Sequence, residues 1–240
     1  MGTLLIPLSG PLQSWGSSSR FATRATEKAP TKSGVIGLLA AARGLRRTDP
    51  LAELLTLSFG VRVDQPGKIV RDFQTERSLD GSVSMPLSYR YYLGDATFLA
   101  GVESPDLTLL EALQQNLKQP RFPLYLGRRS CPPAGPVWAS VVPENLVDAL
   151  TDAEWRATAV HRAAHRTQET VTLQLLVDAE ATDPSAETYR DEPVSFNPER
   201  REYAWRKVRS SDVVVRNPDY VPSHSGRPSH DPTDFTAEGF

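Results

Sequence analysis

The sequence feature that most constrains the fold is the segment 30–44, PTKSGVIGLLAAARG. Pro-Thr at its beginning is a helix start signal, and Gly44 at its end is a stop signal. Between them, apolar side chains recur with the period of an amphipathic helix. The apolar run TLLIPLS at 3–9 precedes it and is typical of a buried strand. The chain therefore begins with a strand that is followed, after a polar loop at 17–29, by a packed helix.

Two glycines lie inside this predicted helix. Gly34 and Gly37 each cost about 1 kcal/mol relative to alanine in a helix interior. Their spacing of three residues places them on one side of the helix. We expect another segment of backbone to approach the helix closely along that side.

The rest of the chain continues the alternation of strands and helices. The patterns predict a short helix at 51–57, strands at 59–65 and 68–76, two strands within 88–103 that break at Gly94-Asp95, a helix at 106–119, and strands at 171–179 and 202–215. The first part of this order suits a split βαβ, ferredoxin-like sheet, so the predicted fold class is α+β.

Composition shifts divide the chain into three parts. Residues 1–135 form the first predicted domain, and a proline-bounded break near 132–143 separates it from a small β-rich C-terminal domain at 136–216. Residues 217–240 are rich in Pro, Ser and Asp and poor in aliphatic side chains. Such a segment cannot bury enough apolar surface to order itself, so we expect a disordered tail.

Composition also restricts the class of protein. A single cysteine excludes an internal disulfide framework, and no apolar run approaches the roughly 20 residues that span a bilayer. With no evident signal peptide, these features predict a cytoplasmic protein that does not contact a membrane. Residues 1–135 carry 16 Lys+Arg and 11 Asp+Glu (+5), and residues 136–240 carry 11 and 18 (−7). A basic first part and an acidic second part permit an anionic ligand on one face only.

Three basic stretches are candidates for contact with that ligand. Lys32 and Ser33 open the first helix, where free amides and the helix dipole attract phosphate. Arg128 and Arg129 follow a glycine, and guanidinium groups bind phosphate oxygens in a bidentate way. The alternatives are an ordinary capped helix beside a solvated lysine and a basic surface turn.

The third stretch is the strand pair that flanks an Asp80-Gly81 turn. It carries Arg71, Gln74, Arg90, Tyr91 and Tyr92. Arginines interleaved with aromatic residues fit single-stranded nucleic acid, with rings under bases and guanidinium groups on phosphates. The alternative is a hairpin whose aromatic side chains belong to the core.

Few residues of the sequence have a pattern that suggests catalysis. His161 and His165 have an i, i+4 spacing, but no glutamate lies between them and no third metal ligand is obvious, so a solvated helix face is favoured. Cys131 has no histidine nearby and is expected to be a buried thiol. No nucleophile-elbow, dinucleotide or Walker motif is found. The sequence therefore predicts no catalytic residue, metal or cofactor.

Taken together, several segments resemble one known family. They are GPLQSWG (10–16), PTKSGVIGLLAAARG (30–44), VRDFQTE (70–76), YRYYLGDATF (89–98), FPLYLGRRSCPP (122–133) and RDEP (190–193). In this order they are similar to the Cas-five family of CRISPR-associated proteins, in its type I-E branch, whose members are subunits of the surveillance complex Cascade. The similarity is strong over 1–135 and thins to scattered pieces up to about 215.

The resemblance implies a ferredoxin-like, RRM-type domain with a protruding β-hairpin thumb at about 68–95. It also implies that the protein binds the repeat-derived 5′ handle of mature CRISPR RNA and has no catalytic role. The thumb would contact the first backbone subunit of Cascade, the large subunit would dock beside it, and target DNA would be a partner only indirectly. A metal-independent endoribonuclease, as in the I-C branch of the family, is the alternative. A phosphate-binding enzyme of small molecules is a third.

In such a fold, the loop at 10–16 lies near the start of the first helix. Our hypothesis is that Gln13 and Trp15 help to build the handle pocket, with Trp15 stacking on a base or holding the pocket open. The alternative is that Trp15 packs into the core. By motif match, the remaining residues expected to face RNA are Lys32, Ser33, Arg71, Gln74, Arg90, Tyr91, Arg128 and Arg129.

Overall fold

A computed structural model of the chain describes residues 1–16 and 23–222, so part of the predicted 17–29 loop lies outside the described residues. Six elements form a ferredoxin-like unit: β1 (Gly2–Ser9), α1 (Lys32–Arg43), β4 (Ser58–Gln65), β7 (Thr97–Ser104), α2 (Leu107–Lys118) and β8 (Ser140–Val142). Their strands lie in the order β4-β7-β1-β8, and each pairing is antiparallel. Each helix therefore crosses between two parallel strands with a third strand between them. The α+β, ferredoxin-like prediction is confirmed.

Three C-terminal strands extend the same sheet. They are β9 (Thr170–Ala179), β10 (Glu187–Ser195) and β11 (Glu202–Arg216). β9 pairs with β4, and the sheet continues outward as β9-β11-β10. The division into domains at 135/136 stays a prediction, and the sheet itself runs across that boundary. Where a short helix was expected at 51–57, the chain forms a single 3-10 turn, η1 (Leu54–Thr56).

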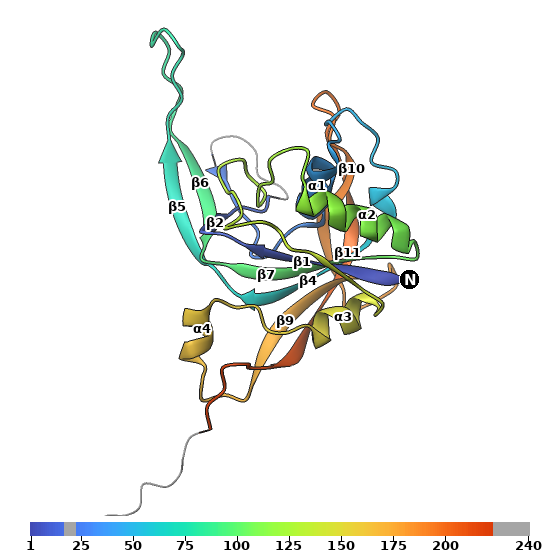
Figure 1. Ribbon diagram of the computed structural model, residues 1–240. Coiled ribbons are helices and arrows are strands. Elements are labelled where there is room, and N and C mark those ends of the chain that lie inside the picture. The colour runs from blue at the N-terminus through green and yellow to red at the C-terminus, as the bar shows by residue number, and fades with distance from the viewer. Residues whose placement is uncertain (17–22, 223–240) are drawn as a thin grey trace, which may run out of the picture.

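A long hairpin is inserted between β4 and β7. Its strands, β5 (Lys68–Gln74) and β6 (Ser88–Gly94), are antiparallel and project from the sheet as the most extended part of the described chain (Figure 1). Two short strands, β2 (Leu12–Gln13) and β3 (Thr23–Arg24), pair with the other edge of β6. The chain then turns at Asp95, whose φ of 56° places it in the left-handed region. We call this hairpin, with its connecting loop, the thumb.

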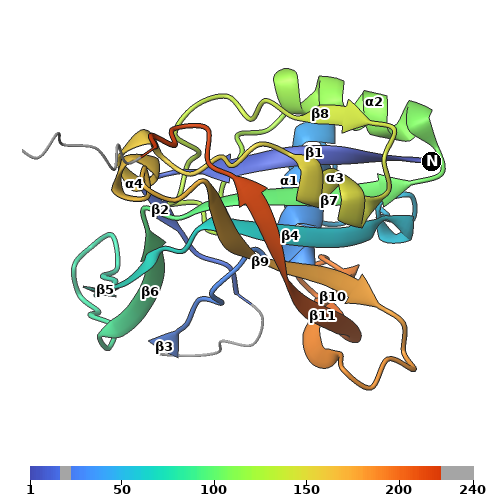
Figure 2. The ribbon, with the colours of Figure 1, turned by 90° about the horizontal axis from the view of Figure 1, so that it is seen from below.

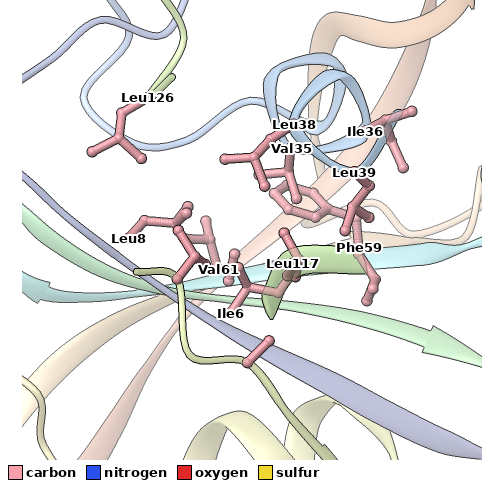
Figure 3. Close-up of a cluster of buried hydrophobic side chains, with 14 of the residues drawn as sticks. Ile6, Leu8, Val35, Ile36, Leu38, Leu39, Phe59, Val61, Leu117 and Leu126 are labelled. Carbon is pink, nitrogen blue, oxygen red and sulfur yellow. The ribbon is translucent and has the colours of Figure 1, made fainter. Parts of the chain in front are cut away.

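The main core lies between α1, α2 and one face of the sheet. Thr31 caps α1 by accepting a hydrogen bond from the Gly34 amide, and Gly44 ends it in the left-handed conformation, as the sequence predicted. The apolar face of α1 packs down toward the sheet, where Val35 and Leu39 meet Ile6 and Phe59 (Figure 3). Because this face is fully committed to the core, the opposite face of α1 is left for other contacts.

The glycines of α1 do not make room for a second segment of backbone, as was expected from the sequence. A Cβ at Gly34 would lie 2.7 Å from the Trp15 ring, whereas a Cβ at Gly37 would lie 3.8 Å from the Phe196 ring. Aromatic rings, not a second backbone, therefore approach this side of the helix. Only Gly34 is required by the packing.

The other face of the sheet carries α3 (Leu146–Asp152) and α4 (Ala159–Ala164) (Figure 2). Beneath them, the fully buried Arg62 side chain pairs with Asp64 at 2.7 Å. Its remaining donors bond the carbonyl oxygens of Leu150, Ala153 and Glu154. A buried cation with every donor satisfied ties the end of α3 to β4.

His161 of α4 and His165, which caps its C-terminal end, pack on a buried tryptophan instead of forming a solvated helix face. The His161 and His165 rings meet the Trp155 ring edge-on at 5.8 Å and 5.7 Å between centroids. Burial lowers the pKa of His161, and the charge of His165 lowers it further. No group of three or more potential ligands for a metal ion is found among residues 1–16 and 23–222.

The chain after β11 begins in contact with α4. Asn217 is buried, and its side-chain amide donates hydrogen bonds to the carbonyl oxygens of His165 and Gln168. The predicted disordered tail is therefore wrong for 217–222, and its remainder at 223–240 lies outside the described residues. No helix in the described part of the chain is long and apolar enough to cross a bilayer.

The two glycines of α1 give a matched test of the packing. We expect Gly34→Ala to lower the free energy of unfolding by about 1–3 kcal/mol, because the new methyl group overlaps the buried Trp15 ring. Gly37→Ala should raise it by about 0.5–1 kcal/mol, because its site is open and alanine is the better helix former. Urea unfolding of both variants measures the difference, and equal effects would contradict this packing.

The His161 environment predicts a pH dependence. Its folded-state pKa lies below the ordinary value of about 6.5, so the unfolded chain takes up the proton first as pH falls. The contribution of neutral His161 is thus fully present above about pH 6.5 and is lost as pH falls toward the folded-state pKa. Urea midpoints at about pH 7.5 and 5.5 should differ less in His161→Gln than in the parent chain. An unchanged difference would contradict the assignment.

Candidate nucleic-acid interface

A groove of about 540 Å³ runs along the face of α1 that points away from the core. Its floor is the small-residue side of α1, including Gly37 and Ala41. Four arginines surround it, namely Arg46, Arg47, Arg129 and Arg201, together with the aromatic residues Phe122, Tyr125, Phe196 and Tyr203. None of the described residues that line it is acidic. Arginines without ion pairs beside partly exposed rings make a positive, stacking surface.

The groove is assembled from segments far apart in the sequence. Arg46 and Arg47 follow the glycine that ends α1, and Arg129 lies in the proline- and glycine-rich loop. Arg201 lies in the turn between β10 and β11, and Tyr203 is one of the first residues of β11. All four arginine side chains are exposed, and none forms an ion pair with a described residue. The groove is therefore basic at neutral pH.

The loop at 127–130 joins the groove to the base of the thumb. Gly127 has a φ of 86°, and a Cβ there would lie 1.9 Å from the Ser14 carbonyl oxygen, so only glycine fits. The Ser14 amide donates to the Leu126 carbonyl oxygen, and the Ser14 hydroxyl donates to the Tyr91 carbonyl oxygen. Loop, first turn and thumb strand thus form one continuous surface.

The thumb places the predicted residues on two faces. Arg71 stands opposite Tyr91, while Gln74 lies on the other face together with Arg90. Arg71 is exposed, and its guanidinium lies 5.5 Å over the ring of Tyr89. Because successive side chains of a strand point to opposite faces, the residues predicted to face RNA do not all lie on one face of the thumb.

Arg90 has a guanidinium hydrogen-bond donor that no described residue uses. Its Nη2 lies 3.2 Å from the exposed Glu76 carboxylate, and its buried Nε has no hydrogen-bond partner among the described residues. An unpaired buried guanidinium nitrogen is costly unless a ligand satisfies it. Gln74, by contrast, donates its amide hydrogen to Asp72. Arg90 stays the strongest candidate on the thumb.

Gln13 and Trp15 belong to the core, which corrects the pocket hypothesis. Both side chains are fully buried. The Gln13 amide donates to the carbonyl oxygens of Leu8 and Ala96, and its Oε1 accepts a hydrogen bond from the Trp15 indole at 3.0 Å. No polar atom of the pair is left for a base. Trp15 instead supports Gly34 from below the groove.

Lys32 is also corrected. Its ammonium forms ion pairs with Asp178 at 3.1 Å and Glu192 at 2.8 Å, and its backbone amide donates to Asp191. Protein carboxylates therefore already occupy the helix start that was expected to attract phosphate. Ser33 is mostly buried and lines the groove, so it stays a candidate.

The two arginines of the basic loop have different environments. Arg128 donates to the carbonyl oxygens of Arg24 and Ala25, and its guanidinium lies 5.2 Å over the ring of Tyr92. It acts as a brace between the loop, β3 and β6, which corrects its assignment to RNA. Arg129 is exposed toward the groove, with no hydrogen bond or ion pair from its side chain among the described residues.

Sequence reasoning missed much of the groove. Arg46-Arg47 is a second arginine pair, separated from Gly44 by one residue, and a signal similar to that of Gly127-Arg128-Arg129 was present there. Phe196, Arg201 and Tyr203 had no such signal, because only tertiary packing brings the β10–β11 hairpin to α1.

The site holds few groups suited to acid–base catalysis. None of the described lining residues is a histidine or carboxylate, and Tyr125 and Tyr203 are its only phenols. Cys131 is buried beneath the loop, and burial raises the pKa of its thiol, as expected for a structural cysteine.

Comparison with known proteins now decides the family. A family model described as CRISPR-associated protein (Cas_Cas5) matches residues 3–209, which is most of the chain. The chain belongs to the Cas-five family. The resemblance seen in the sequence motifs is thus confirmed.

Individual relatives agree with this membership. The Cascade subunit CasD of Escherichia coli (strain K12) is 34% identical over 156 residues, covering 56% of this chain and 69% of that protein. A solved crystal structure of a Cas protein is 38% identical with a TM-score of 0.68, covering 92% of this chain and 98% of that one. A chain of a CRISPR RNA-guided surveillance complex is 30% identical with a TM-score of 0.73, covering 93% and 95%. The Cas-five fold thus extends through the C-terminal strands.

The corrected roles of Lys32 and Arg129 can be separated by experiment. We expect Lys32→Met to lower the free energy of unfolding by about 3 kcal/mol, because it removes a buried cation, leaves half-buried Glu192 without its partner and leaves Asp178 with Arg206 alone. Arg129→Ala should change it by less than about 0.5 kcal/mol, as for most surface substitutions. Urea unfolding measures both. If Lys32→Met is as stable as the parent chain, Lys32 is not the structural cation described above.

Proposed function

We propose that this Cas-five protein is a non-catalytic Cascade subunit that binds the 5′ handle of CRISPR RNA in antiviral defence. The observation that carries the proposal is the continuous surface from the thumb base, across the 127–130 loop, into the arginine-lined groove. Single-stranded RNA is bound by such surfaces, with arginines on phosphates and aromatic rings on unstacked bases. The similar protein CasD is a Cascade subunit, and the similar solved chain belongs to a CRISPR RNA-guided surveillance complex, which supports the assignment to Cascade.

Six predicted residues remain in the proposed RNA-facing set, together with two added by the groove. At the thumb, Arg71 and Tyr91 would meet the RNA from one face and Arg90 from the other. Ser33 and Arg129 would meet it in the groove, where Arg46 and Arg201 add charge. Gln74 stays in the set only through the half-buried remainder of its side chain, because its amide is bonded to Asp72. The arginines should set affinity and salt dependence, and the rings should hold the bases.

The thumb would contact the backbone subunit. It exposes a run of apolar side chains that nothing in the described chain covers, namely Ile69, Phe73, Leu79, Val83, Met85 and Leu87. Apolar surface of this kind marks a protein interface. The large subunit would dock beside the thumb, and target DNA would be met only through the assembled complex.

The endoribonuclease of the I-C branch is the alternative function. Metal-independent RNA cleavage needs a general base near the 2′-hydroxyl, and the groove offers only tyrosines for that task. Incubating the purified protein with repeat RNA and a chelator separates the two functions. We expect intact RNA, and specific cleavage would establish the nuclease.

The first experiment is a tagged pull-down from the native cell, with sequencing of the RNA and identification of the proteins. We expect spacer RNAs that share one repeat-derived 5′ end, together with the other Cascade subunits. Recovery of the protein without RNA would overturn the proposal.

Arg90→Ala tests the thumb contact. We expect handle affinity to fall by about 1–3 kcal/mol, because the side chain has donors that the protein leaves unused. Binding of handle RNA is measured by fluorescence anisotropy, and Arg77→Ala is the control, because Arg77 lies further out on the thumb. Equal affinities of the Arg90→Ala variant and the parent chain would remove Arg90 from the site.

A further inference from the structure

A tryptophan on β11 is exposed in a way that the groove does not explain. The Trp205 side chain is 65% exposed, although it lies within the longest strand of the structure. The Arg190 guanidinium lies 5.8 Å over its ring. The chain's other described tryptophans are Trp15 and Trp155, both buried, and Trp138, which is 61% exposed and has no cation over its ring among the described residues.

A β-bulge creates the Arg190–Trp205 arrangement. Tyr189 pairs with Arg206 and Glu192 pairs with Ala204, so two residues of β10, Arg190 and Asp191, stand opposite Trp205 alone. Asp191 reaches the interior, where it bonds Arg206. Arg190 is left outside over the indole. The irregularity therefore directs one side chain to the core and one to the surface.

Trp205 forms one wall of a hollow of about 430 Å³. Thr188 and Lys207 stand beside it, and neither Lys207 nor Arg190 forms an ion pair with a described residue. Asp178 and Glu192 also line the hollow, and their carboxylates are held by Lys32 and Arg206. Lys32 and Arg206 line the hollow as well, so these carboxylates are paired inside it, and Lys207 is its lining cation without an ion pair among the described residues.

The groups left unused in the hollow select the ligand. Both Asp178 oxygens are bonded to protein groups, whereas Oε1 of Glu192 has no hydrogen bond from a described residue and can accept one from the amino group of a base. An indole with a guanidinium over it is a stacking platform for a base, and Lys207 can meet the adjoining phosphate. The hollow therefore fits a nucleobase inside with its backbone at the rim.

The hollow and the groove are both lined by residues of β11. Tyr203 lines the groove with Arg201 5.4 Å over its ring, and Trp205 follows two residues later on the same strand. Two arginine–aromatic pairs thus succeed each other along β11, and side chains two residues apart share a face of a strand. A strand of RNA that leaves the groove over Tyr203 would next meet Trp205.

We propose that Trp205 and Arg190 form a second base-binding site, which takes an unpaired base of the same RNA strand beyond the groove. This inference rests on the proposed function. It adds the C-terminal hairpin to the RNA-binding surface, whereas the sequence motifs confined that surface to residues 1–135.

The test compares two exposed tryptophans. The probe is the 5′ segment of the CRISPR RNA recovered with the protein, and its affinity is measured by fluorescence anisotropy on the full chain. We expect Trp205→Ala to weaken binding about tenfold or more, from the cost of one lost base stack. Trp205→Phe should retain most of the affinity, because a ring remains. Trp138→Ala, the matched control, should bind like the parent chain.

A second measurement does not depend on a truncated side chain. In Trp138→Phe, the only exposed tryptophan among the described residues is Trp205. Adding the RNA probe should quench its emission and protect it from acrylamide, whereas the same variant with Trp205→Phe should show no such change. Urea unfolding confirms that each variant is folded.

The outcomes separate the two proposals. If Trp205→Ala binds RNA like the parent chain while Arg90→Ala and Arg129→Ala bind weakly, the second site is overturned and the proposed function stands. If Trp205→Ala keeps its RNA but loses a protein subunit in the pull-down, the hollow is a protein interface and the second site is again overturned. If the parent chain recovers no RNA, both proposals fail.

Discussion

The structure depends on one buried carboxylate, Asp191, which joins the C-terminal hairpin to the first helix. Its two oxygens accept hydrogen bonds from the Arg206 guanidinium at 2.6 Å and 2.9 Å, and one of them also accepts the amide of Lys32 at 2.8 Å. Arg206 in turn bonds Asp178, which pairs with Lys32. Burial acts to lower the pKa of Arg206, but these carboxylates more than offset it and raise the pKa. Each charge in the network has at least one partner of opposite sign, and the two cations are shared among three carboxylates, so removing either cation leaves a carboxylate without its partner.

This network decides where the functional surface lies. It brings β10 against α1, as Figure 1 shows, and thereby places Arg201 and Tyr203 across the groove from the small-residue face of α1. It also neutralises the charge of Lys32, so the positive potential of the groove comes from other residues. The same bulge that turns Asp191 inward leaves Arg190 over Trp205. One local irregularity therefore serves both the core and the surface.

Arginines in this protein do two kinds of work. Arg62, Arg128 and Arg206 are committed to carboxylates or backbone carbonyls and hold elements together. Arg46, Arg129 and Arg201 are exposed and without ion pairs in the described chain. Exposed charges contribute little to stability, because water already solvates them. The second group is therefore free to serve a ligand, and substituting it should not endanger the fold.

Local sequence determined most of the elements of this fold, because strand and helix periods, caps and turn residues act over short distances. The run at 3–9, the bounds of α1 and α2, and the break at Gly94-Asp95 were all predictable for that reason, and the motifs sufficed for the family. The environment of each side chain was decided only by tertiary structure. Trp15 and Lys32 are residue types that often bind ligands. In this fold Trp15 packs into the core, and Lys32 pairs with a carboxylate of the acidic C-terminal strands. The groove's far wall comes from β11, some 160 residues after α1, and no local pattern encodes such a contact.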